Sequence, residues 1–93
     1  EYRRMGISLE RLSRTVALIE GSWQRTSRHH ALRELENVLA EQHEVERDAE
    51  NIEDAFLRGY IYEQLDIVAA TRRSLAEDVR WDIESNRNNS GII

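Results

Sequence analysis

A chain of 93 residues, 40% hydrophobic and 33% charged, is long enough for one domain and too apolar for a disordered segment. No apolar run approaches the ~20 residues that cross a bilayer, so we expect no membrane span. The absence of cysteine excludes disulfides and thiolate metal sites, and the absence of proline suits long helices. No apolar signal segment follows the first residues, which favours an intracellular chain.

The first predicted helix covers about residues 9–24, after a lead-in at 1–7. Ser8 stands where an N-cap residue is expected, directly before the apolar pattern. Gly21 lies inside this helix and costs roughly 1 kcal/mol relative to alanine, unless it marks the close approach of another helix. The apolar residues repeat the spacing of a helix that packs along one face. They are Leu9, Leu12, Val16, Ile19 and Trp23.

The second predicted helix is the longest, about 28–58, with Ser27 as its N-cap. Its seam residues alternate in steps of four and three over about four heptads, which is the a/d pattern of coiled-coil packing. The seam positions are Ala31, Leu35, Val38, Gln42, Val45, Ala49, Ile52, Phe56 and Gly59. Gln42 is a polar residue in this seam, of the kind that fixes helix register.

Charge is distributed unevenly along the chain. The first 33 residues carry seven arginines against three glutamates, whereas the next 33 carry eleven acidic residues against two arginines. A basic helix followed by an acidic helix across a short connection predicts an antiparallel hairpin. In that hairpin Arg11 and Arg14 are expected within reach of Glu41 and Glu44.

A third helix is predicted over about 61–84, because the apolar pattern changes phase at Gly59. An arginine followed by glycine is typical of a helix C-terminus. A turn at Gly59 explains the change of phase, and so does a stutter in one continuous helix over 28–84. Residues 86–93 are polar and turn-rich, which predicts a flexible tail and leaves a single helical domain over 8–85.

The polar residues do not form a recognisable catalytic or metal centre. His29 and His30 are adjacent and point about 100° apart on a helix, and His43 has no second histidine one turn away. The acidic residues of the middle segment flank an apolar seam, as solvated carboxylates do. We therefore predict no catalytic, cofactor-binding or metal-ligating residues, no cofactor and no enzymatic activity. The spacing of Arg25 and His30 is similar to that of HEPN-type ribonucleases, which leaves a nuclease as a remote alternative.

The segment from Arg3 to Leu12 contains the run Gly6-Ile7-Ser8-Leu9-Glu10 and resembles the segment that follows the winged helix in mercury-resistance-type regulators. The resemblance covers about ten residues and does not include a DNA-reading helix-turn-helix. It implies the dimerisation region of a nucleic-acid-binding or transcription regulator as an alternative function. Nucleic acid is not the expected partner of this chain itself, because the acidic middle segment would pair with the arginines and repel phosphates.

Taken together, the patterns predict an all-α fold, either an antiparallel helical hairpin or a three-helix bundle, with coiled-coil-like packing and a long central helix. The expected function is a non-catalytic module for protein–protein interaction or oligomerisation, a scaffold or regulator element. Its expected partners are a second copy of the chain, as a dimer, or a helix of another protein. The predicted interaction seam consists of Leu12, Val16, Ile19, Trp23, Leu35, Val38, Val45, Ile52, Phe56, Tyr60, Leu65 and Trp81.

Overall fold

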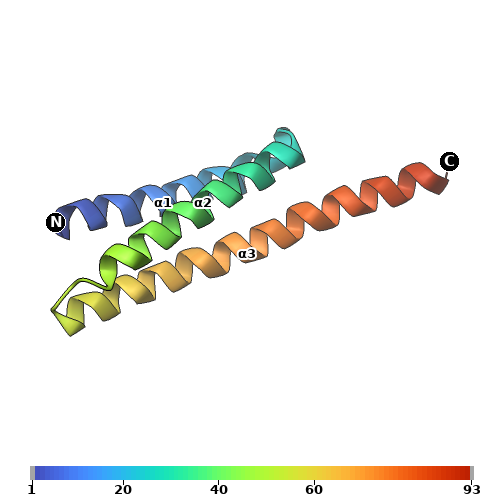
Figure 1. Cartoon of the computed structure of the whole chain (residues 1–93). Coiled ribbons are helices and arrows are strands. Elements are labelled where there is room, and N and C mark those ends of the chain that lie inside the picture. Colours follow the sequence, from blue (N-terminus) through green and yellow to red (C-terminus); the bar gives the residue numbers. More distant parts are fainter. Residues whose placement is uncertain (1, 93) are drawn as a thin grey trace.

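The computed structural model describes the backbone of residues 2–92 and the side chains of residues 3–87. It contains three α-helices and one turn of 3-10 helix, and no strand occurs between residues 2 and 92. The elements are α1 (Tyr2–Ser22), η1 (Trp23–Arg25), α2 (Arg28–Ala49) and α3 (Ala55–Ile92). Helix α2 runs antiparallel to both neighbours, so α1 and α3 point the same way (Figure 1). The predicted all-α three-helix bundle is confirmed.

The bundle is a rod. Its principal extents are 60 × 17 × 16 Å, and its radius of gyration of 16.1 Å exceeds the about 12 Å expected of a compact domain of this length. Helix α3 sets the long dimension, because 38 residues in α-helix span about 57 Å. The prediction of a long central helix is therefore wrong, since α2 has 22 residues and the long helix is the third.

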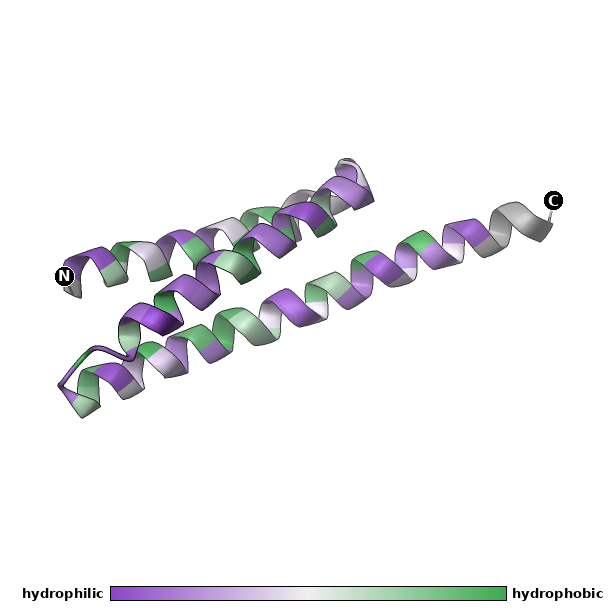
Figure 2. Cartoon of the chain, viewed as in Figure 1, coloured by the Kyte–Doolittle hydropathy of each residue, from purple (hydrophilic) through white to green (hydrophobic). Residues whose placement is uncertain are grey.

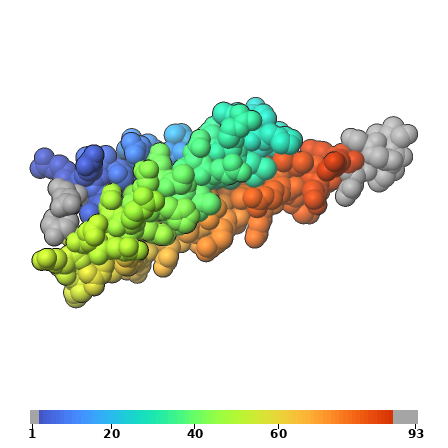
Figure 3. All heavy atoms as spheres, in the orientation of Figure 1, coloured from blue at the N-terminus to red at the C-terminus, as the bar shows by residue number. Residues whose placement is uncertain are grey.

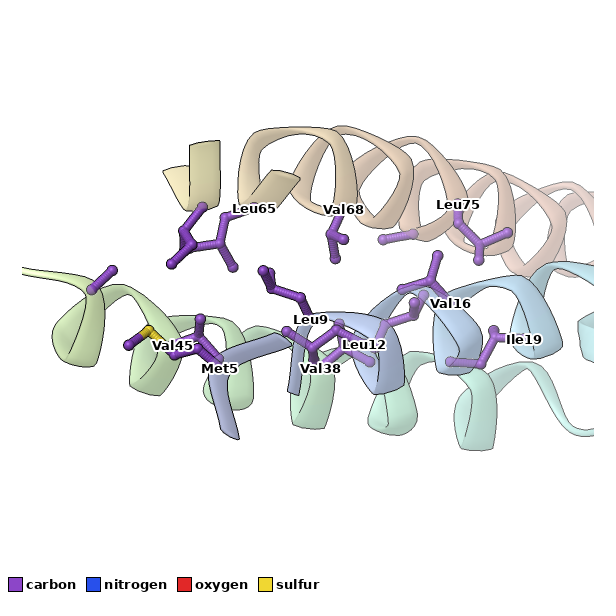
Figure 4. Close-up of a cluster of buried hydrophobic side chains, with 14 of the residues drawn as sticks. Met5, Leu9, Leu12, Val16, Ile19, Val38, Val45, Leu65, Val68 and Leu75 are labelled. Atoms are coloured by element: carbon purple, nitrogen blue, oxygen red, sulfur yellow. The ribbon is translucent and has the colours of Figure 1, made fainter. Parts of the chain in front are cut away.

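The core is a single apolar seam to which each helix contributes one face. Hydrophobic and hydrophilic residues alternate along all three helices (Figure 2), which gives each helix one stripe to bury. Leu65, Val68 and Leu75 point from α3 toward the side chains of α1 and α2 (Figure 4). Leu12, Leu65 and Val79 are the largest side chains that are fully buried. The helices thus hold one another by continuous contact along their length.

Helix α1 begins earlier than predicted. Residues 2–7 are helical instead of forming a lead-in, and Ser8 lies inside the helix, not at its N-cap. The reason is Met5, which stands one turn before Leu9 and extends the apolar stripe into the core with only 6% of its surface exposed. Gly21 has no other atom close to where a Cβ would lie, so it does not mark a close approach of helices.

The connection between α1 and α2 is held by capping and by α3. Ser27 caps α2 as predicted, since its Oγ accepts a hydrogen bond from the backbone N–H of His30 at 3.3 Å. The Nε of Arg28 donates to the Oδ2 of Asp82 on α3 at 2.8 Å, and the Arg28 guanidinium lies 5.7 Å from the centre of the Trp23 ring. In the space-filling view the α1–α2 connection lies against the C-terminal part of α3 (Figure 3).

The turn between α2 and α3 lies at residues 50–54, not at Gly59, and the two helices are not continuous. Asp54 is the N-cap of α3, because its Oδ1 accepts hydrogen bonds from the backbone N–H groups of Phe56 at 2.9 Å and Leu57 at 3.3 Å. Ile52 anchors the turn in the core, and its carbonyl accepts a hydrogen bond of 2.6 Å from Arg58. Gly59 therefore lies inside a helix.

Helix α3 also extends further than predicted. Its backbone is helical to Ile92, where a flexible tail had been expected over 86–93, and Ile93 lies outside the described residues. The Arg28–Asp82 ion pair marks the place where the other two helices end beside it. Beyond that point α3 projects from the bundle on its own (Figure 1).

Candidate interaction surface

The structure divides the twelve residues of the predicted interaction seam into two groups. Eight are buried inside the bundle itself, where they join the three helices of one chain. These are Leu12, Val16, Ile19, Leu35, Val38, Val45, Ile52 and Leu65. Trp23 is partly buried and packs against the same core. This group is occupied within one chain and does not offer a surface to a partner.

The other three, Phe56, Tyr60 and Trp81, are exposed on α3. The prediction that Phe56 continues the packing seam of the second helix is wrong, because 91% of its surface is exposed. The cause is the turn at residues 50–54, which starts a new helix with a new phase. Phe56 is the second residue of that helix, and it is carried to the side opposite the core.

These three residues lie on one face of α3 together with Ile67. At about 100° per residue, the four side chains fall within an arc of about 60°. Their exposed fractions are 91% for Phe56, 72% for Trp81, 57% for Ile67 and 55% for Tyr60. We call Phe56, Tyr60, Ile67 and Trp81 the outer stripe. Its centre lies about 150° around the helix from the centre of the buried residues of α3, so α3 has two separate apolar faces.

Shallow hollows adjoin the outer stripe at two places. The first surrounds its N-terminal end, between Asp54 and Glu63, and is lined by Phe56, Leu57 and Tyr60. The second lies between Glu20 of α1 and a stretch of α3 with small side chains. That stretch contributes Ala70, Thr71, Ser74, Leu75 and Asp78. Large apolar side chains beside small ones form ridges and grooves, into which the side chains of another helix can pack.

Two polar groups interrupt the buried faces. Gln42 is buried in the α2 seam as predicted, with its Nε2 donating to Glu46 at 3.3 Å and its Oε1 without a hydrogen-bond partner among the described residues. Arg72 is half-buried on the inner face of α3, and its Nε is likewise without a partner in the described part. Burial lowers the pKa of Arg72 below its usual value, and repulsion from Arg73 and Arg80 adds to the effect.

The predicted pairing of basic and acidic helices is confirmed in part. Arg11 of α1 lies 3.7 Å from Glu41 of α2, as the antiparallel hairpin requires. Arg14 instead pairs with Glu10 on its own helix at 3.2 Å. Both pairs are exposed, and such pairs stabilise a fold only slightly.

A polar hollow of about 390 Å³ lies between α1 and α2, but its lining has no clear chemical purpose. Arg4 and Arg11 line it from α1, and Glu41, Glu44 and Asp48 line it from α2. The two arginines on one wall face three carboxylates on the other, so the hollow has a net charge of only −1, which favours no one class of ligand. The structure gives no catalytic geometry to this hollow.

His30, His43 and Arg25 contact residues that lie three or four positions away in the sequence. His30 pairs with Glu34, His43 with Glu46 at 3.6 Å, and both histidines are exposed. Arg25, which shares the ribonuclease-like spacing with His30, donates to the carbonyl of Gly21 at 2.8 Å. Within the described residues no group of three or more histidine, aspartate or glutamate side chains is placed to hold a metal ion. No described helix is both long and apolar enough to cross a membrane.

Ile67 and the alignment of the outer stripe on one face of α3 were not predicted from the sequence. A signal was present, because Tyr60, Ile67 and Trp81 are separated by seven and fourteen residues, which are whole heptads. The prediction placed Tyr60 and Trp81 in the same seam as Leu65, which the structure buries, so it did not separate the exposed face of α3 from the buried one. Two further apolar residues, Ile7 and Leu18, are exposed on α1, apart from the outer stripe.

Comparison with known proteins identifies no relative of this chain: no family model, no curated protein and no solved structure matches it.

Proposed function

We propose that this chain is a non-catalytic helical module that self-associates through the outer stripe of α3. The observation that carries the proposal is that four large apolar side chains, exposed by 55% to 91%, share one face of one helix. Scattered apolar residues are common on protein surfaces, but several large ones aligned on one face of one helix favour an interaction site. Tyrosine, tryptophan and phenylalanine are also the residues that contribute most to protein–protein interfaces.

The location of the stripe supports the same proposal. A helix face is recognised most simply by another helix, whose side chains fill the spaces between its own. The contacts of α3 with α1 and α2 along its inner face hold its backbone in helical form, so association through the outer stripe does not have to order that backbone. The side chains of His30, His43 and Arg25 are exposed and contact residues of their own helix or of the adjoining helix, whereas catalysis usually depends on titratable groups gathered in a pocket poor in water.

The test is the mass of the chain in solution, measured by light scattering over a range of concentrations. We expect a dimer or a larger species for the native sequence, and a monomer for Ile67→Glu, because a charge in the middle of the stripe would have to lose its hydration on association. Leu18→Glu is the matched control. It places the same charge on an equally exposed apolar residue of α1 and should leave the mass unchanged.

Circular dichroism should show the same helix content for all three proteins, because the substituted side chains lie outside the core. A native chain that stays monomeric up to millimolar concentration would contradict the proposal. So would an association that Ile67→Glu leaves intact.

A further inference from the structure

The outer stripe belongs to a longer regular pattern on α3. Eight exposed residues follow one another in steps of four, three, four, three, four, three and four, which is an a/d register on the side away from the core. We call these eight positions the outer register. They are Phe56, Tyr60, Glu63, Ile67, Ala70, Ser74, Glu77 and Trp81.

The spacing between successive positions of the outer register is the same whether it is followed from Phe56 or from Trp81. A second α3 laid antiparallel therefore places each of the eight positions opposite another. Phe56 meets the partner's Trp81, Tyr60 meets the partner's Glu77, Glu63 meets the partner's Ser74, and Ile67 meets the partner's Ala70. By two-fold symmetry each of these contacts occurs twice.

Each of the four layers is complementary in size or in hydrogen bonding. Phe56 and the partner's Trp81 form an aromatic pair at both ends of the interface. The large Ile67 meets the small side chain of the partner's Ala70 near the two-fold axis. The hydroxyls of Tyr60 and Ser74 can donate to the carboxylates of the partner's Glu77 and the partner's Glu63. The two acidic residues of the register therefore gain hydrogen-bond donors in this arrangement.

A parallel pairing lacks this complementarity. It would place each position against its own copy, so that Glu63 would face the partner's Glu63 and Glu77 the partner's Glu77. Like charges within a seam oppose association. In the antiparallel arrangement Asp66 lies beside the partner's Arg73 on both sides of the axis, which adds two attractive flanking contacts, whereas a parallel pair would instead place Arg73 beside the partner's Asp78.

We infer that the outer register binds a second copy of this chain as an antiparallel helix pair, with Phe56 opposite the partner's Trp81. The inference rests on the proposed function, to which it adds the identity of the partner, the orientation and the register. The like charges of Glu63 and of Glu77 then disfavour the parallel orientation, and the aromatic ends fix the register.

Disulfide trapping tests the register directly, because the chain has no native cysteine. Glu63 and Ser74 are exposed and face each other across the proposed interface. Oxidation of an equimolar mixture of Glu63→Cys and Ser74→Cys should give mainly the mixed disulfide dimer, identified by its mass. Ser13→Cys, on the exposed side of α1, is the control and should form no enriched dimer.

Charge exchange provides a second test that does not depend on cysteine chemistry. Asp66→Arg and Arg73→Asp should each raise the dissociation constant of the dimer on the order of tenfold, because each change turns two attractive contacts into repulsive ones. The double variant Asp66→Arg/Arg73→Asp should restore native affinity. A parallel dimer would not show this rescue, because there Asp66 and Arg73 do not meet.

The outcomes separate this inference from the proposed function. Enriched Glu63→Cys homodimers would show a parallel pair and would overturn the inference. A dimer that Ile67→Glu abolishes, but that shows neither the mixed disulfide nor the charge rescue, would retain the proposed function and overturn the antiparallel register. A native chain that is monomeric at all concentrations would overturn both.

Discussion

The two apolar faces of α3 differ in composition and in surroundings, because the inner face is built from aliphatic residues and the outer stripe mainly from aromatic ones. On the inner face Ile61, Leu65 and Val79 are at most 4% exposed, whereas the residues of the outer stripe are at least 55% exposed. Hydrophobic residues stabilise a fold only when folding removes them from water. The inner face therefore accounts for the stability of the bundle, and the outer stripe adds nothing to it in a single chain. Apolar character alone does not tell these two roles apart.

The largest expected effect contrasts one residue from each face. Leu65→Ala should lower the free energy of unfolding by about 2–5 kcal/mol, because it leaves a cavity at a site that is 1% exposed. Ile67→Ala, two positions away, should change the stability of the monomer by no more than about 0.5 kcal/mol. Urea denaturation at low protein concentration measures both. Equal losses would show that Ile67 is buried in the folded monomer and would remove the distinction between the faces.

The inner face should become more stable when its charged interruption is removed. Arg72→Met keeps the packed stem and eliminates a buried Nε that has no partner among the described residues. It also relieves the repulsion from Arg73 and Arg80 that contributes to the lowered pKa of Arg72. We expect a gain of about 1–2 kcal/mol in the free energy of unfolding. Arg73→Met, at an exposed neighbouring position, is the control and should have little effect, and a loss with Arg72→Met would assign the arginine a stabilising contact.

A smaller effect on stability is expected at Asp82, close to the place where α1 and α2 end beside α3. Asp82→Asn should cost about 1 kcal/mol, because it replaces a charge-assisted hydrogen bond to the partly buried Arg28 by a neutral one. A double-mutant cycle with Arg28→Gln, followed by urea denaturation, isolates the contribution of the pair. If the two losses were simply additive, the ion pair would not be what holds the α1–α2 connection to α3.

The smallest effect concerns Gly59, which lies on the exposed side of α3. A Cβ at this position would meet no atom within 4 Å, so Gly59→Ala should only improve helix propensity. We expect a gain of about 0.5 kcal/mol in monomer stability, since the position is close to the helix N-terminus. Thermal unfolding followed by circular dichroism gives the comparison. A loss of stability would show that the glycine has a structural role in the folded chain.

Much of the fold could be predicted from the sequence. The spacing of Leu12, Val16 and Ile19 gave the first packing face, and Ser27 gave the start of α2, because these signals are local. The antiparallel hairpin and the contact of Arg11 with Glu41 followed from the opposite charges of the two helices. The periodicity of apolar residues thus carries most of the information on a helical bundle.

The position of the second turn and the outer stripe could not be predicted in the same way. The seam of α2 continues in phase through Ile52 and Phe56, so periodicity predicted a helix where Asp54 caps a new one. Ile52 is buried in both interpretations, although the structure places it in a turn. The exposure of Phe56 follows only once the true start of α3 is known. Where two successive helices share one apolar pattern, the boundary between them has to be predicted from the capping residue as well as from the apolar spacing.

The short connections have a consequence for the way the chain folds. Within residues 2–92 the α-helices are separated only by residues 23–27 and 50–54, so each helix packs against its neighbour in sequence after closing a small loop. Such local topology is typical of folding in microseconds to milliseconds. The chain has no proline, so refolding is not delayed by slow isomerisation of prolyl bonds. Because α2 belongs to both hairpins, either hairpin can form first and serve as the template on which the remaining helix docks.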